Sequence, residues 1–121
     1  MGVLMTTGGD LVRTTRPYMP QTKNALAVLG LQIATERRAR RMTSQELAER
    51  AVVSRLTVRK AENGDPTVSI GIVFELASIV GVDLFGIDPS ELPLAVGRTR
   101  DKLALLPKRI RKSAEVINDD F

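Results

Sequence analysis

Residues 43–64, which read TSQELAERAVVSRLTVRKAENG, decide the fold. Thr43 and Glu46 have the spacing of a capping box, in which each side chain accepts a hydrogen bond from the other residue's backbone N–H. A helix is therefore predicted to begin directly after Thr43. Ser54 is a second N-cap residue and predicts another helix over residues 55–62. The stretch thus predicts two short helices joined by a tight turn.

Further helices are predicted on both sides of this pair. The dipeptide Asn63-Gly64 ends the second helix, because glycine adopts the left-handed conformation that follows many helices. One helix is predicted from Asn24 to about Arg40 and another over residues 70–80, with a short turn over 83–87. Apolar residues at helical spacing are the candidate core: Leu26, Leu29, Ile33, Leu47, Ala48, Ala51, Val58, Ala61, Val73, Leu76, Ala77 and Val80.

The chain is predicted to be all-α, with one compact domain of four to five helices. Residues 1–23 lack periodicity and are expected to form a flexible arm. The domain is expected to span residues 24–88. Residues 89–121 are then a C-terminal extension, with a helix predicted over 91–106 and a basic tail, and are expected to bind a partner or to mediate dimerisation.

Charge is strongly segregated along the 121 residues, although the net charge is only +4. Residues 13–60 hold eleven Lys and Arg against three Glu, whereas residues 61–97 hold six acids and no base. Residues 98–112 are again basic, with seven cations and one Asp. Such a pattern indicates either a cationic face that meets a polyanion or simply a well-solvated surface.

Composition weighs against catalysis. The chain has no Cys and no His, which excludes Cys/His metal sites and every imidazole base. It also lacks the GxGxxG and GxxxxGK[ST] phosphate motifs. We therefore expect no catalytic residues, no metal and no cofactor. The chain has no apolar run long enough for a membrane span and no basic stretch followed by an apolar run at its N-terminus, so we expect a cytoplasmic protein that does not bind membranes.

The run LGLQIATERRARRMTSQELAERAVVSRLTVRKAENGDP resembles the Cro/cI-like helix-turn-helix domains of the XRE family. The resemblance covers residues 29–84, and its pieces occur in the family order. It implies a lambda repressor-like DNA-binding domain that regulates transcription at a double-stranded operator. The helix that begins at Arg55 is then the recognition helix, whose N-terminal part reads the major groove.

Helix geometry assigns candidate base contacts to the start of that helix. Arg55 is placed to read a guanine in a bidentate manner, and Leu56 to contact a thymine methyl. Thr57 and Lys60 lie further along the exposed side. Leu56 has an alternative role in the core or in a dimer contact, and Thr57 has one in completing the first turn of the helix.

Phosphate contacts are expected beside the recognition helix. Ser44 and Gln45 begin the preceding helix, where free N–H groups and the positive end of the helix dipole attract anions. Arg41 and Arg59 are the cationic candidates, with solvent exposure as the alternative for each. By resemblance, Arg37 and Glu62 form a buried ion pair that ties the first helix to the recognition helix.

One position departs from the family pattern. Val52 stands in the turn where relatives usually carry Gly, and that position commonly needs a positive φ. Positive φ is costly for a β-branched residue. The sequence therefore predicts either an altered turn or a strained one.

Residues 64–112 make the resemblance more specific, since they point to one group within the family. GDPTVSIGIVFELASIVGVDL, followed by DPSE and LALLPKRIRK, looks like HipB-type antitoxins, which partner HipA-like Ser/Thr kinases. This implies a repressor that autoregulates its operon. The alternatives are a prophage-type regulator without a toxin and an interaction module that does not bind DNA. We expect a homodimer, with candidate interface residues on one apolar run: Ile79, Val82, Leu84, Phe85 and Ile87.

Overall fold

The computed structural model describes residues 16–112. The chain divides into two compact units, one ending at Leu84 and one beginning at Phe85. Within the described residues, every regular element is an α-helix or a 3-10 turn. The predicted all-α fold is therefore confirmed.

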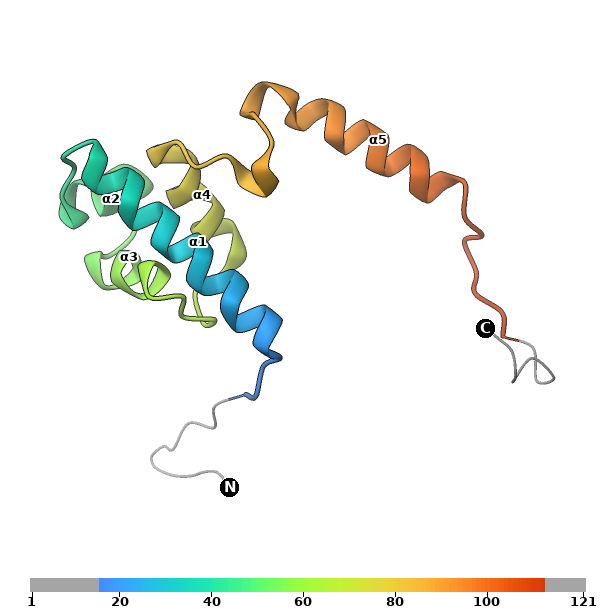
Figure 1. Cartoon of the computed structure of the whole chain (residues 1–121), viewed down its shortest axis with the longest axis horizontal. Helices are drawn as coiled ribbons and strands as arrows, with labels where there is room; N and C mark the ends of the chain where they lie inside the picture. Colours follow the sequence, from blue (N-terminus) through green and yellow to red (C-terminus); the bar gives the residue numbers. More distant parts are fainter. Residues whose placement is uncertain (1–15, 113–121) are drawn as a thin grey trace. The chain divides into compact units, whose positions relative to one another are not determined.

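The first unit contains four α-helices, α1 to α4 (Figure 1). They are α1 (Pro20–Ala39), α2 (Ser44–Ala51), α3 (Arg55–Glu62) and α4 (Ile70–Val80). Helix α3 packs against α1 and α2, while α4 packs against the other side of the same pair. This arrangement holds the short α3 in place, because an eight-residue helix is not stable by itself in water.

The start of α1 was predicted incorrectly. The helix begins at Pro20, so the predicted cap Asn24 lies inside its second turn. Proline suits the first helical position because its φ is already helical and its missing N–H would have had no partner. The last four residues of the predicted arm therefore belong to α1, and residues 1–15 of that arm lie outside the described part of the chain.

Both predicted caps of the central helices are present. The Glu46 N–H donates to the Thr43 hydroxyl at 3.0 Å, and the Thr43 N–H donates to the Glu46 carboxylate at 2.8 Å. The Thr57 N–H donates to the Ser54 hydroxyl at 3.1 Å. Gly64 follows α3 with a φ of 73°, as predicted. Local hydrogen bonds therefore fix where α2 and α3 begin.

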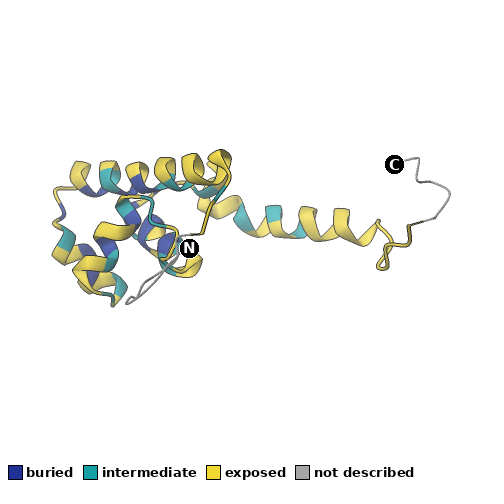
Figure 2. Cartoon of the chain, turned by 90° about the horizontal axis from the view of Figure 1, so that it is seen from below, coloured by how far each residue is buried: buried dark blue, intermediate teal, exposed yellow. Residues whose placement is uncertain are grey.

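The core forms where the four helices meet (Figure 2). Its fully buried side chains come from every helix: Ile33 from α1, Leu47 from α2, Val58 from α3, and Leu76 and Val80 from α4. Of the predicted core residues, Leu29 and Ala51 are only partly buried but pack against this cluster. Leu26 is also only partly buried and does not belong to the cluster, so its assignment to the core is wrong. The helical periodicity identified the other core residues correctly.

The second unit is described by itself. It contains a 3-10 turn, η2 (Pro89–Glu91), and the helix α5 (Leu92–Ala104), while the turn η1 (Leu84–Gly86) spans the boundary between the units. The Asp88 carboxylate accepts hydrogen bonds from the hydroxyl and the N–H of Ser90, and these bonds lower the pKa of Asp88. Helix α5 buries none of its residues.

The apolar run proposed as a dimer surface is partly wrong. Val82 is buried in the core of the first unit, with 7% of its surface exposed. Ile79 and Leu84 pack against that core as well. These three residues therefore belong to the first unit's core, whereas Phe85 is 78% exposed.

The turn between α2 and α3 contains the unusual Val52. Its backbone adopts the left-handed conformation, with φ 58° and ψ 48°, and its side chain is 87% exposed. The turn is therefore left-handed, as predicted for a position that usually takes glycine, and accepts the strain of a β-branched residue.

Val52→Gly is expected to stabilise the protein by about 1 kcal/mol, because glycine adopts this conformation without a steric penalty. The exposed valine loses little packing when it is removed. For a domain of this size, thermal unfolding should shift upward by roughly 4–8 °C. Val53→Gly is the matched control and should destabilise, since Val53 packs against the core. A lower melting temperature for Val52→Gly would show that the backbone of Val52 is not strained.

Candidate nucleic-acid interface

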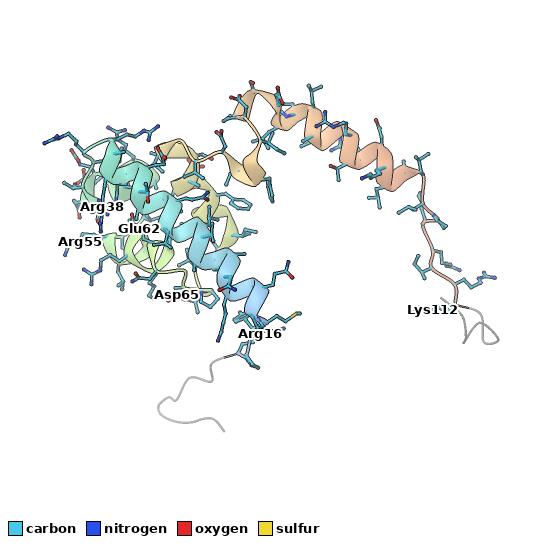
Figure 3. The ribbon with its side chains drawn as sticks, in the orientation of Figure 1. Arg16, Arg38, Arg55, Glu62, Asp65 and Lys112 are labelled. Atoms are coloured by element: carbon cyan, nitrogen blue, oxygen red, sulfur yellow. The ribbon has the colours of Figure 1, made fainter. Side chains whose placement is uncertain are left out.

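Helix α3 presents a single exposed face. Arg55, Leu56, Arg59 and Lys60 are all exposed, whereas Val58 and Ala61 on the other side are buried. Arg55 and Arg59 are four residues apart and so lie one above the other on the helix. Arg59 thus shares the face of the predicted base-contacting residues. Figure 3 shows Arg55 at the outer edge of the domain.

The structure distinguishes between the alternative roles predicted for two residues on α3. Leu56 is 56% exposed, so a place in the core of its own domain is excluded. Thr57 is half-buried, and its hydroxyl lies 2.9 Å from the Ser54 hydroxyl. The Thr57 side chain is therefore engaged in the cap of α3, which favours its role in the first turn.

Helix α2 packs against α3, and Ser44 and Gln45 are its first two residues. Ser44 is half-buried and Gln45 is exposed. The Gln45 amide donates to the Glu49 carboxylate at 3.1 Å. The capping box uses the N–H of Glu46, and no described group accepts a bond from the N–H of Ser44 or Gln45. Such N–H groups at a helix start suit a phosphate oxygen.

The basic end of α1 is divided among different environments. Arg37 is buried, and Arg40 forms an exposed ion pair with Glu36 at 2.7 Å. Arg38 and Arg41 are exposed and form no ion pair with any residue that the structure describes. Arg41 also has a positive φ of 56° in the loop before α2. Two of the four arginines are therefore available to a ligand.

The buried ion pair suggested by resemblance is present. The Arg37 Nε lies 2.7 Å from one Glu62 oxygen, and its Nη2 lies 3.1 Å from the other. The Arg37 Nη1 also donates to the Met42 carbonyl at 2.9 Å. The hydrogen bond with Glu62 raises the pKa of Arg37, so this guanidinium stays charged. The pair attaches the last turn of α3 to α1.

Gly30 adds a second constraint on α3 that the sequence reasoning missed. A Cβ at this position would lie 2.6 Å from the Ala61 carbonyl oxygen and 2.5 Å from that of Glu62. The backbones of α1 and α3 therefore approach each other more closely than any side chain allows. The sequence does contain a sign of this contact, namely a glycine within a helical pattern. Glycine weakens a helix, so its presence there indicates that close packing requires it.

The described residues contain no group of three or more acidic side chains placed to hold a metal ion. No helix in the described part of the chain is long and apolar enough to cross a membrane.

Comparison with known proteins gives one match. The family model described as Helix-turn-helix matches residues 33–87, which include α2, α3 and α4. Neither the curated proteins nor the solved structures contain a match to the chain. The matched residues include the turn between α2 and α3, where the structure has Val52 in the left-handed conformation. Residues 33–87 are therefore a helix-turn-helix domain of the Cro/cI type.

Proposed function

We propose that this protein binds double-stranded DNA at an operator and regulates transcription, with α3 in the major groove. The observation that carries the proposal is the exposed face of α3, with three cations and one leucine on a helix held by the Arg37–Glu62 pair. An α-helix with its side chains is about 10–12 Å in diameter, and the major groove is about 12 Å wide. The groove therefore admits α3, whose eight residues are about 12 Å long and present about two turns to the bases.

The roles of the individual residues follow from their positions on α3 and α2. Arg55 is in the first turn and is assigned to a guanine, Leu56 to a thymine methyl, and Lys60 to a base one turn further along. Thr57 supports the first turn and lies within reach of the same groove. The proposed phosphate ligands flank the groove: Ser44, Gln45, Arg41 and Arg59.

Arg55→Ala is expected to weaken operator binding by about 1–3 kcal/mol and to relax the preference at one base pair. The operator would first be located by a protection footprint upstream of the protein's own gene. Binding would then be titrated on that duplex and on duplexes changed at single positions.

Arg55→Lys is the matched control for this prediction. It keeps the positive charge but loses the two-point contact with guanine, so it should retain more affinity than Arg55→Ala while losing the same base preference. Normal operator binding by Arg55→Ala would show that the assignment of Arg55 is wrong. Unchanged function of Arg55→Ala, together with no DNA binding by the unchanged protein, would favour an interaction module instead.

The regulator is proposed to act as a homodimer on two half-sites about one helical turn apart. Helix α5 offers an apolar surface for this, since three of its apolar residues and Thr99 follow one another at spacings of four, three and four. Leu106, two residues after the helix, continues the spacing, and these five residues are called here the α5 stripe: Leu92, Val96, Thr99, Leu103 and Leu106. Such spacing is typical of helices that pair along their length.

The side chains of the α5 stripe support this use. Val96, Leu103 and Leu106 are 52%, 69% and 62% exposed, and the Thr99 hydroxyl donates to the Ala95 carbonyl. Sedimentation of the full chain should therefore show a dimer that Leu103→Glu dissociates. A monomer both with and without DNA would refute the dimer.

The narrower role is that of a repressor which is also the antitoxin of a HipA-like kinase. It rests on the resemblance of residues 64–112 alone. A kinase-sized reading frame beside the gene, and co-purification of its product with this chain, would support it. A stand-alone regulator is the alternative, and it predicts neither.

A further inference from the structure

We propose that residues 98–112, called here the basic segment, form a second DNA contact that binds phosphates of the duplex on which the helix-turn-helix domain is seated. This inference rests on the proposed function, because it requires that the domain bind DNA. The inference goes beyond the proposed function by assigning a ligand to a part of the chain that lies outside the match to the Helix-turn-helix family.

The basic segment holds seven cations and a single acid, Asp101. All seven cations are exposed, and none of their side chains forms an ion pair with a described residue. They are Arg98, Arg100, Lys102, Lys108, Arg109, Arg111 and Lys112. Among the described cations of the first unit, Arg37 and Arg40 are the two that have a carboxylate partner. The basic segment therefore carries its positive charge without internal neutralisation.

The spacing of these cations approaches the spacing of the phosphate charges along duplex DNA. Arg98, Arg100 and Lys102 lie on α5 within four residues, which is about 6 Å of helix axis. Residues 108–112 follow Pro107 without helix or strand, and their four cations span at most about 13 Å. Duplex DNA carries one negative charge per about 1.7 Å of its axis. Each group of cations can therefore contact several phosphates.

The position of like charges on α5 points to the same ligand. Arg98 and Lys102 are four residues apart, so they lie next to each other on the helix and repel. A polyanion between or beside them removes that repulsion. The segment also has sufficient reach, since α5 is about 20 Å long and the eight residues after it extend by up to about 26 Å.

An anionic lipid surface fits these residues less well. A helix that lies on a membrane keeps its cations on one face and anchors the other with aromatic and leucine side chains. Residues 98–112 contain no aromatic residue that could anchor such a helix. A tethered domain on the same DNA also gives the basic segment an effective concentration near the millimolar range.

The experiment compares the full chain with a variant in which Lys108, Arg109, Arg111 and Lys112 are all glutamine. Binding to the operator and to a scrambled duplex of equal length is measured between 50 and about 200 mM salt, a range over which counterion release is resolved. We expect the variant to bind both duplexes about 10- to 100-fold more weakly at 0.1 M salt, with the slope of log K against log salt reduced by about 2–4. Lys108→Arg with Lys112→Arg keeps the charge and should change neither quantity.

The ratio of operator to scrambled binding should stay the same in the glutamine variant, because phosphate contacts carry no sequence information. Unchanged affinity and slope, with intact operator preference, would overturn this inference and leave the proposed function standing. Absence of operator binding by the unchanged chain would overturn both. Retention of DNA affinity together with loss of binding to phosphatidylserine-containing vesicles would replace DNA by lipid as the ligand.

Discussion

Gly30→Ala is expected to destabilise the protein by about 3 kcal/mol, at the upper end of what overpacking a well-packed interior usually costs. The new methyl group would meet the carbonyl oxygens of Ala61 and Glu62 at 2.6 and 2.5 Å. Both are backbone atoms of the last turn of α3, so neither can rotate away as a side chain does. Relief requires that α1 and α3 move apart, which opens the core between Ile33 and Val58.

The measurement is urea unfolding of both proteins followed by circular dichroism. Gly71→Ala is the matched control, because a Cβ on Gly71 in α4 meets no atom within 4 Å. Alanine there should stabilise the protein by about 0.5–1 kcal/mol, since it is the better helix former. Equal stability of the Gly30→Ala protein and the unchanged chain would show that the two helices are not held at this distance.

Glu62→Gln is expected to cost about 3 kcal/mol of stability, because it leaves the Arg37 guanidinium buried without a counter-charge. We expect the lower end of the usual range, since 9% and 11% of the two side chains still reach the surface. Glutamine keeps the size of the side chain, so the loss reports the charge rather than a cavity. Because Glu62 closes the last turn of α3, DNA affinity should fall as well.

Glu36→Gln removes the other described ion pair and serves as the control. The Arg40–Glu36 pair is exposed, with 44% and 41% of its side chains accessible. Its loss should change the free energy of unfolding by less than about 0.5 kcal/mol. A similar small change for Glu62→Gln would mean that the buried pair does not hold α3 to α1.

Local signals in the sequence were sufficient to place α2 and α3. Each begins at a side chain that caps it, Thr43 or Ser54, and α3 is followed by Gly64 in the left-handed conformation. These interactions involve residues at most three positions apart, so they can be read from the sequence directly. The core was predictable for the same reason, because helical periodicity marks the buried face.

Contacts between distant segments were not predictable in this way. The approach of Gly30 to the end of α3 joins residues about thirty positions apart, and nothing near Gly30 in the sequence identifies its neighbour. The burial of Val82 likewise depends on how the end of α4 closes the core. The start of α1 was misplaced because two capping signals, Asn24 and Pro20, compete within five residues.

The candidate site was predicted as a face rather than as individual contacts. Helical spacing correctly placed Arg55, Leu56 and Lys60 on the exposed side of α3, and the same spacing puts Arg59 on their face. The structure was also needed to find two side-chain contacts, that of Thr57 with Ser54 and that of Gln45 with Glu49. Each contact depends on a side-chain rotamer, which the sequence does not give. Which bases and phosphates these residues touch stays a prediction.

The left-handed valine between α2 and α3 has a consequence for the genetics of this protein. Valine and glycine codons differ only in their second base, so a single nucleotide change at codon 52 replaces the strained residue by one that tolerates its conformation. A more stable form of the regulator is therefore one mutational step away. Populations selected for retention of operator control at elevated temperature should repeatedly acquire glycine at this codon.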